Sequence, residues 1–305
     1  MNEVNEAETA LAVQRVQEYI ESNIGKSMTL KQLADVAQYS PWHTTRIFKQ
    51  KTGKTPFEYI RALRLSKAAL ILRDDKTKVI DVALDFVFDS QEGFTRAFST
   101  LFGISPGRYR KNPPPIKLFI PQMAYFTYQA FKKMKESATM EKTKSIFVQV
   151  IERPQRKCLI KRGIKAGEYF DYCKEVGCDI WNILCSVKEA LYEPIGMWLP
   201  QHLIEENTSK YVQGVEVPMD YDNKIPEGFE VIVLPPCTMM IFQGEPYNDE
   251  DFMAEIDAVW DHIAKFSPEI YGYKWAEDKA PRFQLAPQGY RGYIEARPVE
   301  RINVA

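Results

Sequence analysis

The sequence of 305 residues has little of what membrane, secreted and metal-binding proteins require. It contains no run of eighteen apolar residues, and its first ten residues lack the basic and apolar stretches of a signal peptide. Its five cysteines, at 158, 173, 178, 185 and 237, include no C-x-x-C pair, which indicates reduced thiols. The three histidines are scattered, so no metal site is expected. We expect a cytoplasmic protein without metal or cofactor.

Signatures of enzymes are also missing. The chain has no nucleophile elbow, phosphate-binding loop, metal pair or dinucleotide fingerprint. We therefore expect a protein that binds its ligands and is not an enzyme.

An excess of charge of either sign is absent from the whole chain but not from its parts. The formal net charge is −1. Residues 1–144 contain 23 Lys and Arg against 15 Asp and Glu, a net charge of +8, and residues 145–305 contain 17 against 26, a net charge of −9. A basic part can approach the phosphates of nucleic acid, whereas an acidic part repels them and attracts cations. Length and charge together predict a multidomain protein.

One stretch of the basic part occurs twice. Residues 29–61 recur fifty positions later as residues 79–110. The identical pairs are Ser40 and Ser90, Thr45 and Thr95, Arg46 and Arg96, Phe48 and Phe98, Gly53 and Gly103, Pro56 and Pro106, and Tyr59 and Tyr109. Each copy predicts a short helix, a turn and a second helix that begins after a serine cap, which is a helix-turn-helix.

The second helix of each copy has an apolar face and a polar face. We expect Ile47 and Phe48 to be buried in the first copy, and Phe94, Ala97, Phe98 and Leu101 in the second. Arg can pair with guanine, Gln with adenine and Glu with cytosine, so the polar faces suit base edges in the major groove of double-stranded DNA. The expected DNA contacts are Trp42, Thr45, Arg46 and Lys49 in the first copy and Gln91, Glu92, Thr95 and Arg96 in the second. The alternative is a solvated polar face, which two copies with matched Thr–Arg pairs disfavour.

These motifs resemble a known family. Residues 40–49, Gly53 and Pro56, followed by residues 94–98, Gly103, Pro106, Tyr109 and Arg110, are similar to the AraC/XylS family of bacterial transcription regulators. The resemblance covers residues 8–111 and implies an all-α double helix-turn-helix DNA-binding domain with a long connecting helix, here 56–72. The family usually has glycine before the aromatic residue of each turn, where this chain has Gln38 and Val87. Because a β-branched residue at positive φ is costly, the second turn either has another geometry or seats its helix weakly on DNA.

Two further segments flank the repeat. Residues 10–24 predict an amphipathic opening helix with Val13, Val16 and Ile20 on one face. The run Lys-Asn-Pro-Pro-Pro after Arg110 predicts a semi-rigid spacer and a domain boundary. We expect residues 112–144 to be a linker and connector, in which the aromatic stretch 116–136 packs on one of the two domains. An interaction module for RNA polymerase or a toxin partner fits these aromatic residues equally well.

The acidic part predicts an α+β domain over residues 145–305. Short β-branched and aromatic runs indicate strands at 147–151, 158–163, 196–199, 211–217, 230–234, 239–243, 282–285 and 290–296. Helices are expected at 179–191 and 251–266, which gives the order β-β-α-β-β twice.

This part resembles the GyrI-like small-molecule-binding domain. The matching residues are 212–218, 241–246, the helix that contains Trp260, and 293–298. The resemblance implies two pseudo-symmetric halves with a ligand groove between them, and a glutamate of the last strand in that groove. An AraC-type domain followed by a GyrI-like domain is a layout known among regulators of the family.

Alternation along the strands suggests which residues face the groove. Tyr293 and Glu295 should lie opposite the helices, as should Glu216, next to Gly214. The expected ligand-binding residues are Glu295, Glu216, Tyr293 and Trp198, and the expected effector is a small cationic or amphiphilic molecule held by carboxylate and cation–π contacts.

Two alternatives stay open for this part. Glu295 could form a surface salt bridge with Arg297 or Arg291. Some GyrI-like domains are similar to small-molecule hydrolases, in which Glu295 with Tyr293 or Tyr273 would act as general base and orienting acid.

Overall fold

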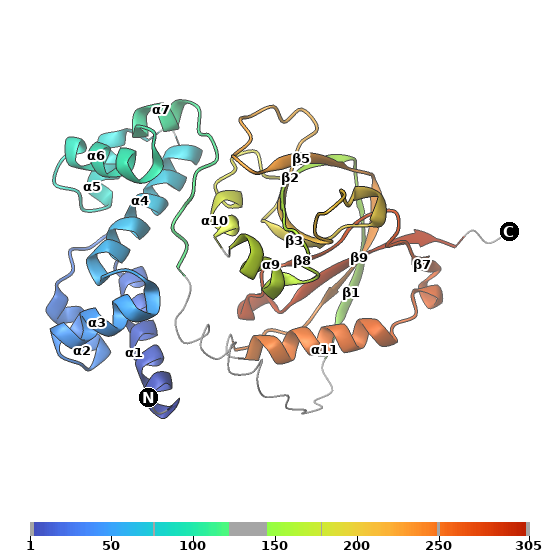
Figure 1. Cartoon of the computed structure of the whole chain (residues 1–305), viewed down its shortest axis with the longest axis horizontal. Helices are drawn as coiled ribbons and strands as arrows, with labels where there is room; N and C mark the ends of the chain where they lie inside the picture. The colour runs from blue at the N-terminus through green and yellow to red at the C-terminus, as the bar shows by residue number, and fades with distance from the viewer. Residues whose placement is uncertain (1–2, 76, 122–144, 178, 249–250, 303–305) are drawn as a thin grey trace. The chain divides into compact units, whose positions relative to one another are not determined.

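The chain divides into two compact units in the computed structural model, which describes residues 3–75, 77–121, 145–177, 179–248 and 251–302 (Figure 1). Unit 1 is Met1–Ala138 and unit 2 is Thr139–Ala305. Among the described residues, no helix combines the length and the apolar character that are needed to span a bilayer.

Unit 1 is helical, as predicted. Its helices are α1 Glu3–Ser22, α2 Leu30–Ala37, α3 Pro41–Thr52, α4 Pro56–Asp74, α5 Val79–Asp85, α6 Gln91–Phe102 and α7 Pro106–Lys111. Thr29 and Thr55 form capping boxes with Gln32 and Glu58, so two helix starts follow from the sequence directly. Helix α1 begins seven residues before the predicted start at residue 10.

Helix α4 connects the two helix-turn-helices and packs on both. It contacts α3 of the first and α5, α6 and α7 in the second part of the unit. Tyr59 and Leu63 of α4 join a cluster that also contains Val16 of α1, Leu33 of α2 and Phe48 of α3. An aromatic chain fills the second part, where Phe94 packs against Phe98 and Phe98 against Tyr109. The two helix-turn-helices are therefore held by one long, mostly buried helix.

Both turns have the same left-handed geometry. Gln38 has φ 60° and Val87 has φ 59°. In each turn the next aromatic residue donates a backbone hydrogen bond across the helix end, from Tyr39 to Ala34 and from Phe88 to Ala83. The first helices of the two repeats, α2 and α5, therefore correspond at a distance of 49 residues, whereas the second helices, α3 and α6, correspond at fifty. Asp89 is the additional residue before Ser90. The second turn therefore does not have another geometry, and Val87 is held in the strained left-handed conformation.

The described part of the connector packs on unit 1. We name residues 113–121 the strap. Within it Leu118 is buried, the backbone N–H of Phe119 donates to Ser66 Oγ at 2.7 Å, and the Phe119 ring meets Tyr59 edge-on at 4.9 Å. The expected packing of the aromatic stretch on one of the two domains is therefore found for residues 116–121, and that domain is unit 1. The remainder of the expected connector, 122–144, lies outside the described residues.

The described residues of unit 2 form an antiparallel sheet of nine strands. They are β1 Phe147–Arg153, β2 Arg156–Arg162, β3 Ile195–Trp198, β4 Tyr211–Val217, β5 Glu230–Leu234, β6 Cys237–Gln243, β7 Tyr273–Trp275, β8 Arg282–Leu285 and β9 Ile294–Arg301. The order is β1-β6-β9-β8-β3-β4-β2-β5, with β7 beside β9. Exchanging β1, β2, β3 and β4 with β5, β6, β8 and β9 reverses this order. The central strands β8 and β3 join the two halves.

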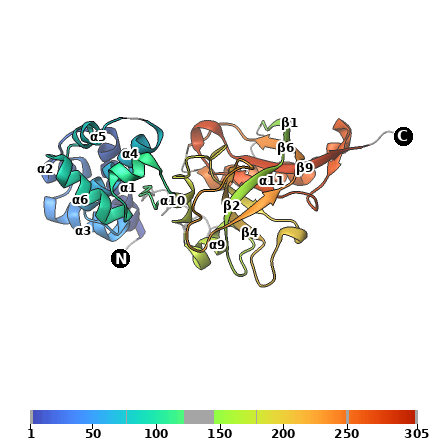
Figure 2. The ribbon, with the colours of Figure 1, turned by 90° about the horizontal axis from the view of Figure 1, so that it is seen from above.

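The sheet has a helix-bearing face and an opposite face (Figure 1, Figure 2). Helices α9 Tyr169–Val176 and α10 Ile180–Leu184 pack on β2, β3 and β4, and α11 Phe252–Lys265 packs on β6 and β9. The opposite face carries an apolar cluster with members from β2, β3, β4, β5, β6, β8 and β9. Each half thus encloses its own core on the helix-bearing face, and the opposite face has one shared core.

Two predicted elements need correction, and two elements were missed. The helix predicted at 179–191 ends at Leu184, and a preceding helix, α9, was missed. The last strand begins at Ile294, because residues 289–291 form a single 3-10 turn. The short strand β7 was also missed, since three residues are too few to show alternation.

The strained turn leads to a stability prediction. Val87→Gly should stabilise unit 1 by about 1 kcal/mol, because relief of a left-handed β-branched residue exceeds the added entropy of the unfolded chain. The free energy of unfolding from urea titration of the full chain measures this. Val36→Gly removes the same side chain from inside α2 and should destabilise by about 1 kcal/mol or more. Equal losses for both variants would show that the Val87 turn stores no strain.

Candidate nucleic-acid interface and effector site

Helices α3 and α6 expose corresponding positions. Buried residues are Thr44, Ile47 and Phe48 in α3 and Phe94, Ala97 and Phe98 in α6. The first eight positions of the two helices follow the same sequence of exposed, half-buried and buried residues. All eight predicted DNA contacts are exposed or half-buried. Leu101 was predicted to be buried, but it is 44% exposed, since it lies one residue before the end of α6.

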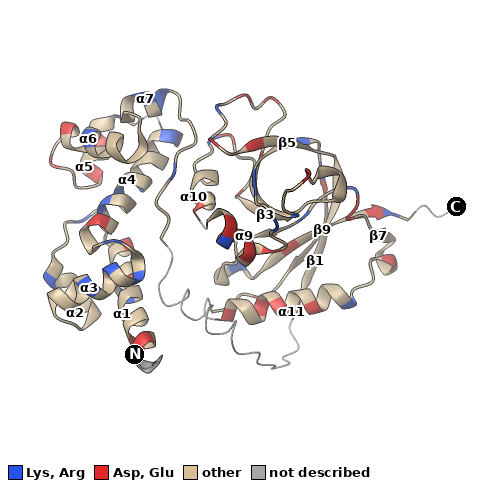
Figure 3. Ribbon diagram, in the orientation of Figure 1, with Lys and Arg blue, Asp and Glu red and all other residues tan. Residues whose placement is uncertain are grey.

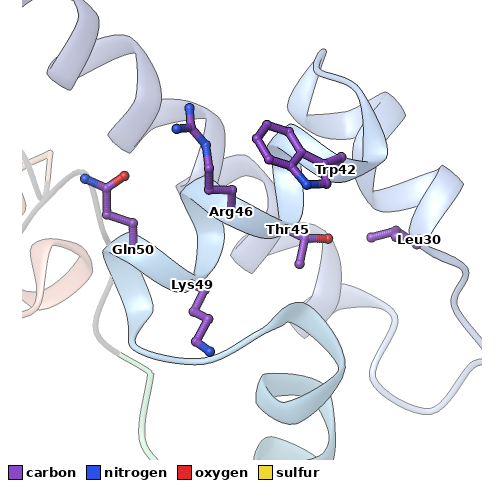
Figure 4. A pocket seen from close by; sticks show the side chains of 6 residues that line it. All are labelled: Leu30, Trp42, Thr45, Arg46, Lys49 and Gln50. Atoms are coloured by element: carbon purple, nitrogen blue, oxygen red, sulfur yellow. The ribbon is translucent and has the colours of Figure 1, made fainter.

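The outer face of α3 combines an aromatic ring with cations. Trp42 is 72% exposed, and the Arg46 guanidinium carbon lies 5.3 Å from its ring centroid. Figure 4 shows the shallow hollow that Leu30, Trp42, Thr45, Arg46, Lys49 and Gln50 line. Such a face can donate hydrogen bonds to guanine and contact a thymine methyl group with the indole. Gln50 was missed, although its position four residues after Arg46 gives it the same helical phase.

The outer face of α6 has both signs of charge. Gln91, Glu92 and Arg96 are exposed and Thr95 is half-buried. In Figure 3, acidic positions are coloured on the ribbon of α5 and α6, and basic positions on the ribbon of α3. Ser90 and Ser40 cap the two helices in the same way, by accepting from the backbone of Gly93 and His43. The two helices are alike in geometry and differ in the chemistry they present.

Three of the four predicted effector residues belong to one polar cluster in unit 2. Glu295 accepts hydrogen bonds on Oε2 from Trp260 Nε1 at 2.6 Å and from the Tyr293 hydroxyl at 3.1 Å. The Tyr293 hydroxyl also contacts Gln284 Oε1 at 2.7 Å, Gln284 donates to the Tyr211 hydroxyl at 3.2 Å, and Tyr211 packs edge-on against Trp198. The cluster thus crosses the junction of the two halves, from β9 through β8 to β4 and β3.

The face assigned to this cluster was wrong. Tyr293 and Glu295 lie on the helix-bearing face, where Tyr293 packs with Val259 and Ile263 of α11. Ile294 and Ala296, which were expected to face the helices, belong to the apolar cluster of the opposite face. Because successive residues of a strand alternate, one wrong assignment reverses the whole strand.

Two members of the cluster, Gly196 and Gln284, were missed in the sequence analysis. A Cβ at Gly196 would lie 2.0 Å from the Tyr211 hydroxyl oxygen, so glycine is needed for the tyrosine to cross β3. Gln284 pairs with both Gly196 and Glu295 across the sheet, a register that a single strand does not reveal. Burial and the Glu295 carboxylate raise the pKa of the Tyr293 hydroxyl well above 10, which keeps it a hydrogen-bond donor.

Glu295 is paired with arginines within the fold. It is fully buried, and its Oε1 lies 2.9 Å from Arg297 Nε and 3.8 Å from Arg282 Nη1. The pairing with Arg297 was foreseen, but as a surface contact. Arg291, the other foreseen partner, pairs instead with Glu193.

Glu216 lies apart from this cluster. It is 2% exposed on the opposite face of the sheet and is bound by Arg153 and, at 2.6 Å, by Arg156 Nε. Glu216 and Glu295 therefore do not face one common groove, and both oxygens of Glu216 are bound by internal arginines. Gly214 leaves no space either, because a Cβ there would lie 2.7 Å from Ile160 Cγ2.

Comparison with known proteins places the first unit among regulators. A family model described as a helix-turn-helix domain matches residues 33–112. The transposon Tn10 TetD protein of Escherichia coli is 45% identical over 94 residues, which are 31% of this chain and 68% of TetD. The transcriptional activator AarP of Providencia stuartii is 39% identical and the match covers 68% of its length. The right origin-binding protein of Escherichia coli strain K12 is 41% identical, but the match covers only 37% of it.

Solved structures give weaker matches. The C-terminal domain of AraT, a response regulator from Geobacillus stearothermophilus, is 29% identical with a TM-score of 0.32, covering 33% of this chain and 84% of that chain. An AraC-type regulator from Chromobacterium violaceum is 24% identical with the same TM-score, covering 34% of this chain and 95% of its own. The sequence relatives, and not these scores, carry the assignment.

The buried ion cluster of Glu216 leads to a prediction. Glu216→Gln should destabilise unit 2 by about 3–5 kcal/mol, because two buried guanidinium groups lose their counter-charge. Denaturant unfolding of the full chain measures it. Glu230→Gln is the matched control, since Glu230 pairs with Arg162 but is 36% exposed, and it should cost at most about 1 kcal/mol. Similar costs for the two variants would contradict the role of buried charge.

Proposed function

Because the chain belongs to the AraC/XylS family of helix-turn-helix transcription regulators, we propose that it binds specific DNA sequences through unit 1 and a small effector through unit 2. The matched exposure of α3 and α6 is the observation that carries the DNA-binding proposal. Two outward helices at equivalent positions, held by α4, suit successive major-groove segments of one DNA duplex.

We propose distinct tasks for the two helices. Helix α3 carries Arg46 and Lys49 and no acid, so it contributes attraction to phosphates as well as base contacts. Helix α6 carries Glu92 near its start, which can accept from cytosine and which repels phosphates. The first helix therefore contributes more to affinity, and the second more to discrimination.

The effector role of unit 2 rests on its own features. The relatives described above cover about a third of this chain, so their activities do not extend to unit 2. Support for a GyrI-like domain comes from the strand order, which reverses when the halves are exchanged, and from a buried carboxylate with aromatic partners where the halves meet. A carboxylate beside indole and phenol rings suits a cationic or amphiphilic effector.

The domain bounds follow as part of the proposal. We assign residues 8–111 to the DNA-binding domain, 145–305 to the effector domain and 112–144 to the connector. The strap packs on α4 and completes the core of the first domain, so a DNA-binding fragment should include it.

The reading of DNA by α3 and α6 leads to a prediction. Arg46→Ala or Arg96→Ala should each cost about 1–3 kcal/mol on the sequence enriched from a random DNA library and should relax preference at one position. Lys49→Ala should weaken binding to specific and random DNA sequences by similar amounts. Gel-shift titrations at fixed salt measure this, and footprinting should show two protected segments about one helical turn apart. Equal losses of Arg46→Ala on specific and random DNA would make Arg46 a phosphate contact.

A second prediction concerns the effector. Benzylguanidinium, a flat cation, should bind the full chain more tightly than neutral benzylurea in calorimetry. Glu295→Gln should weaken the binding of benzylguanidinium by about 3–5 kcal/mol, because the positive charge of the ligand loses its buried counter-charge. Glu277→Gln is the matched control, since this exposed carboxylate also pairs with Arg297 and should change little. An unchanged affinity in Glu295→Gln would place the effector site elsewhere.

A further inference from the structure

Arg282 lies between an aromatic ring and a buried carboxylate. It is on β8, directly opposite Trp198 of β3. Its guanidinium carbon is 4.1 Å from the Trp198 ring centroid, and its Nη1 is 3.8 Å from Glu295 Oε1. Trp198 and Glu295 are almost completely buried, whereas a quarter of the Arg282 side chain reaches solvent. Arg282 therefore lies between the cluster and the solvent.

The contacts of Arg282 are those that a cationic ligand would need. A guanidinium over an indole gains cation–π attraction, and a carboxylate at the same point supplies the counter-charge. Three quarters of the Arg282 side chain is removed from solvent, and this burial lowers the pKa of its guanidinium because the charged form loses hydration. Release into water would restore that hydration, so the side chain can leave if another cation takes over its contacts.

The second arginine at Glu295 is held differently. Arg297 donates from Nε to Glu295 at 2.9 Å and from Nη1 to Glu277 at 3.0 Å, and it lies over Trp275. Displacing Arg297 would therefore break its contacts with two carboxylates and with the ring of Trp275. Of these two arginines, Arg282 is the one whose contacts coincide with the expected ligand contacts.

We propose that Arg282 is an internal occupant of the effector site, which a cationic effector must displace from between Trp198 and Glu295. This inference rests on the proposed effector role of unit 2. Binding is then an exchange of one cation for another, so the net charge beside Glu295 is conserved. Neutral molecules are rejected because they would leave that carboxylate with less compensation. The affinity of the site for an effector is then the difference between two binding free energies: that of the effector with Trp198 and Glu295, and that of the Arg282 guanidinium with the same two groups.

The experiment removes the Arg282 side chain and adds a free guanidinium compound in its place. Arg282→Ala in the full chain should bind benzylguanidinium about tenfold or more tightly than the wild type, measured by calorimetry. Benzylurea, neutral and similar in shape, should show no such gain. The gain should be lost in the double variant Arg282→Ala, Glu295→Gln. Arg282→Met keeps the aliphatic stem on Trp198 and should show the gain as well if the Ala variant folds poorly.

Arg162→Ala is the matched control. It tests whether benzylguanidinium binds in any cavity that loss of an arginine leaves beside carboxylates. Arg162 pairs with Glu205 and Glu230, so it also leaves carboxylates without a partner. If this variant gains affinity for benzylguanidinium as much as Arg282→Ala does, or if neither Arg282 variant gains any, the inference is overturned.

The DNA readout separates this inference from the proposed function. Gel shifts with the enriched DNA are repeated for Arg282→Ala with and without benzylguanidinium. Suppose that Arg282→Ala binds benzylguanidinium more tightly but its affinity for DNA is the same with and without the cation. This result would support Arg282 as an occupant of the site and overturn the effector role of unit 2. A response of DNA affinity to the cation would support both.

Discussion

Burying a carboxylate in a sheet requires positive charge within reach, and unit 2 meets this requirement twice. Glu216 and Glu295 are each nearly or fully buried, and two arginines approach each of them. The two sites lie on opposite faces of the sheet. At Glu216 both arginines are themselves buried, which makes a closed internal cluster. At Glu295 both arginines are partly exposed, so only this carboxylate of the two has partners that solvent can reach.

Much of unit 1 could be predicted from the sequence because its signals are local. Serine, threonine and proline mark the helix starts, and glycine marks two of the ends. The burial of α3 and α6 followed from helical periodicity, except at Leu101 near a helix end. The extra residue Asp89 was missed, since the comparison at a fixed distance of fifty matched the second helices and not the first. The positive φ of Gln38 and Val87 and the backbone hydrogen bonds of Tyr39 and Phe88 reveal the offset.

Less of the site in unit 2 could be predicted, because it depends on pairing between strands. The sequence indicated Glu295, Tyr293 and Trp198, but it treated Glu216 as the counterpart of Glu295. When Pro218 and Pro298 are aligned, Glu216 corresponds to Ala296, one position away. That single step changes the face of the sheet, as the two clusters show. Gly196, Gln284 and Arg282 enter the site through cross-strand register, which no single strand carries.

The strap gives the chain a mechanical anchor. Along the chain, the strap follows the end of α7, but it is held by Tyr59 in the first turn of α4 and by Ser66 in the middle of that helix. Tension on the chain beyond residue 121 is therefore borne first by the hydrogen bond to Ser66 and the ring contact with Tyr59. The load reaches α4, whose side chains position both helix-turn-helices, before it reaches α7.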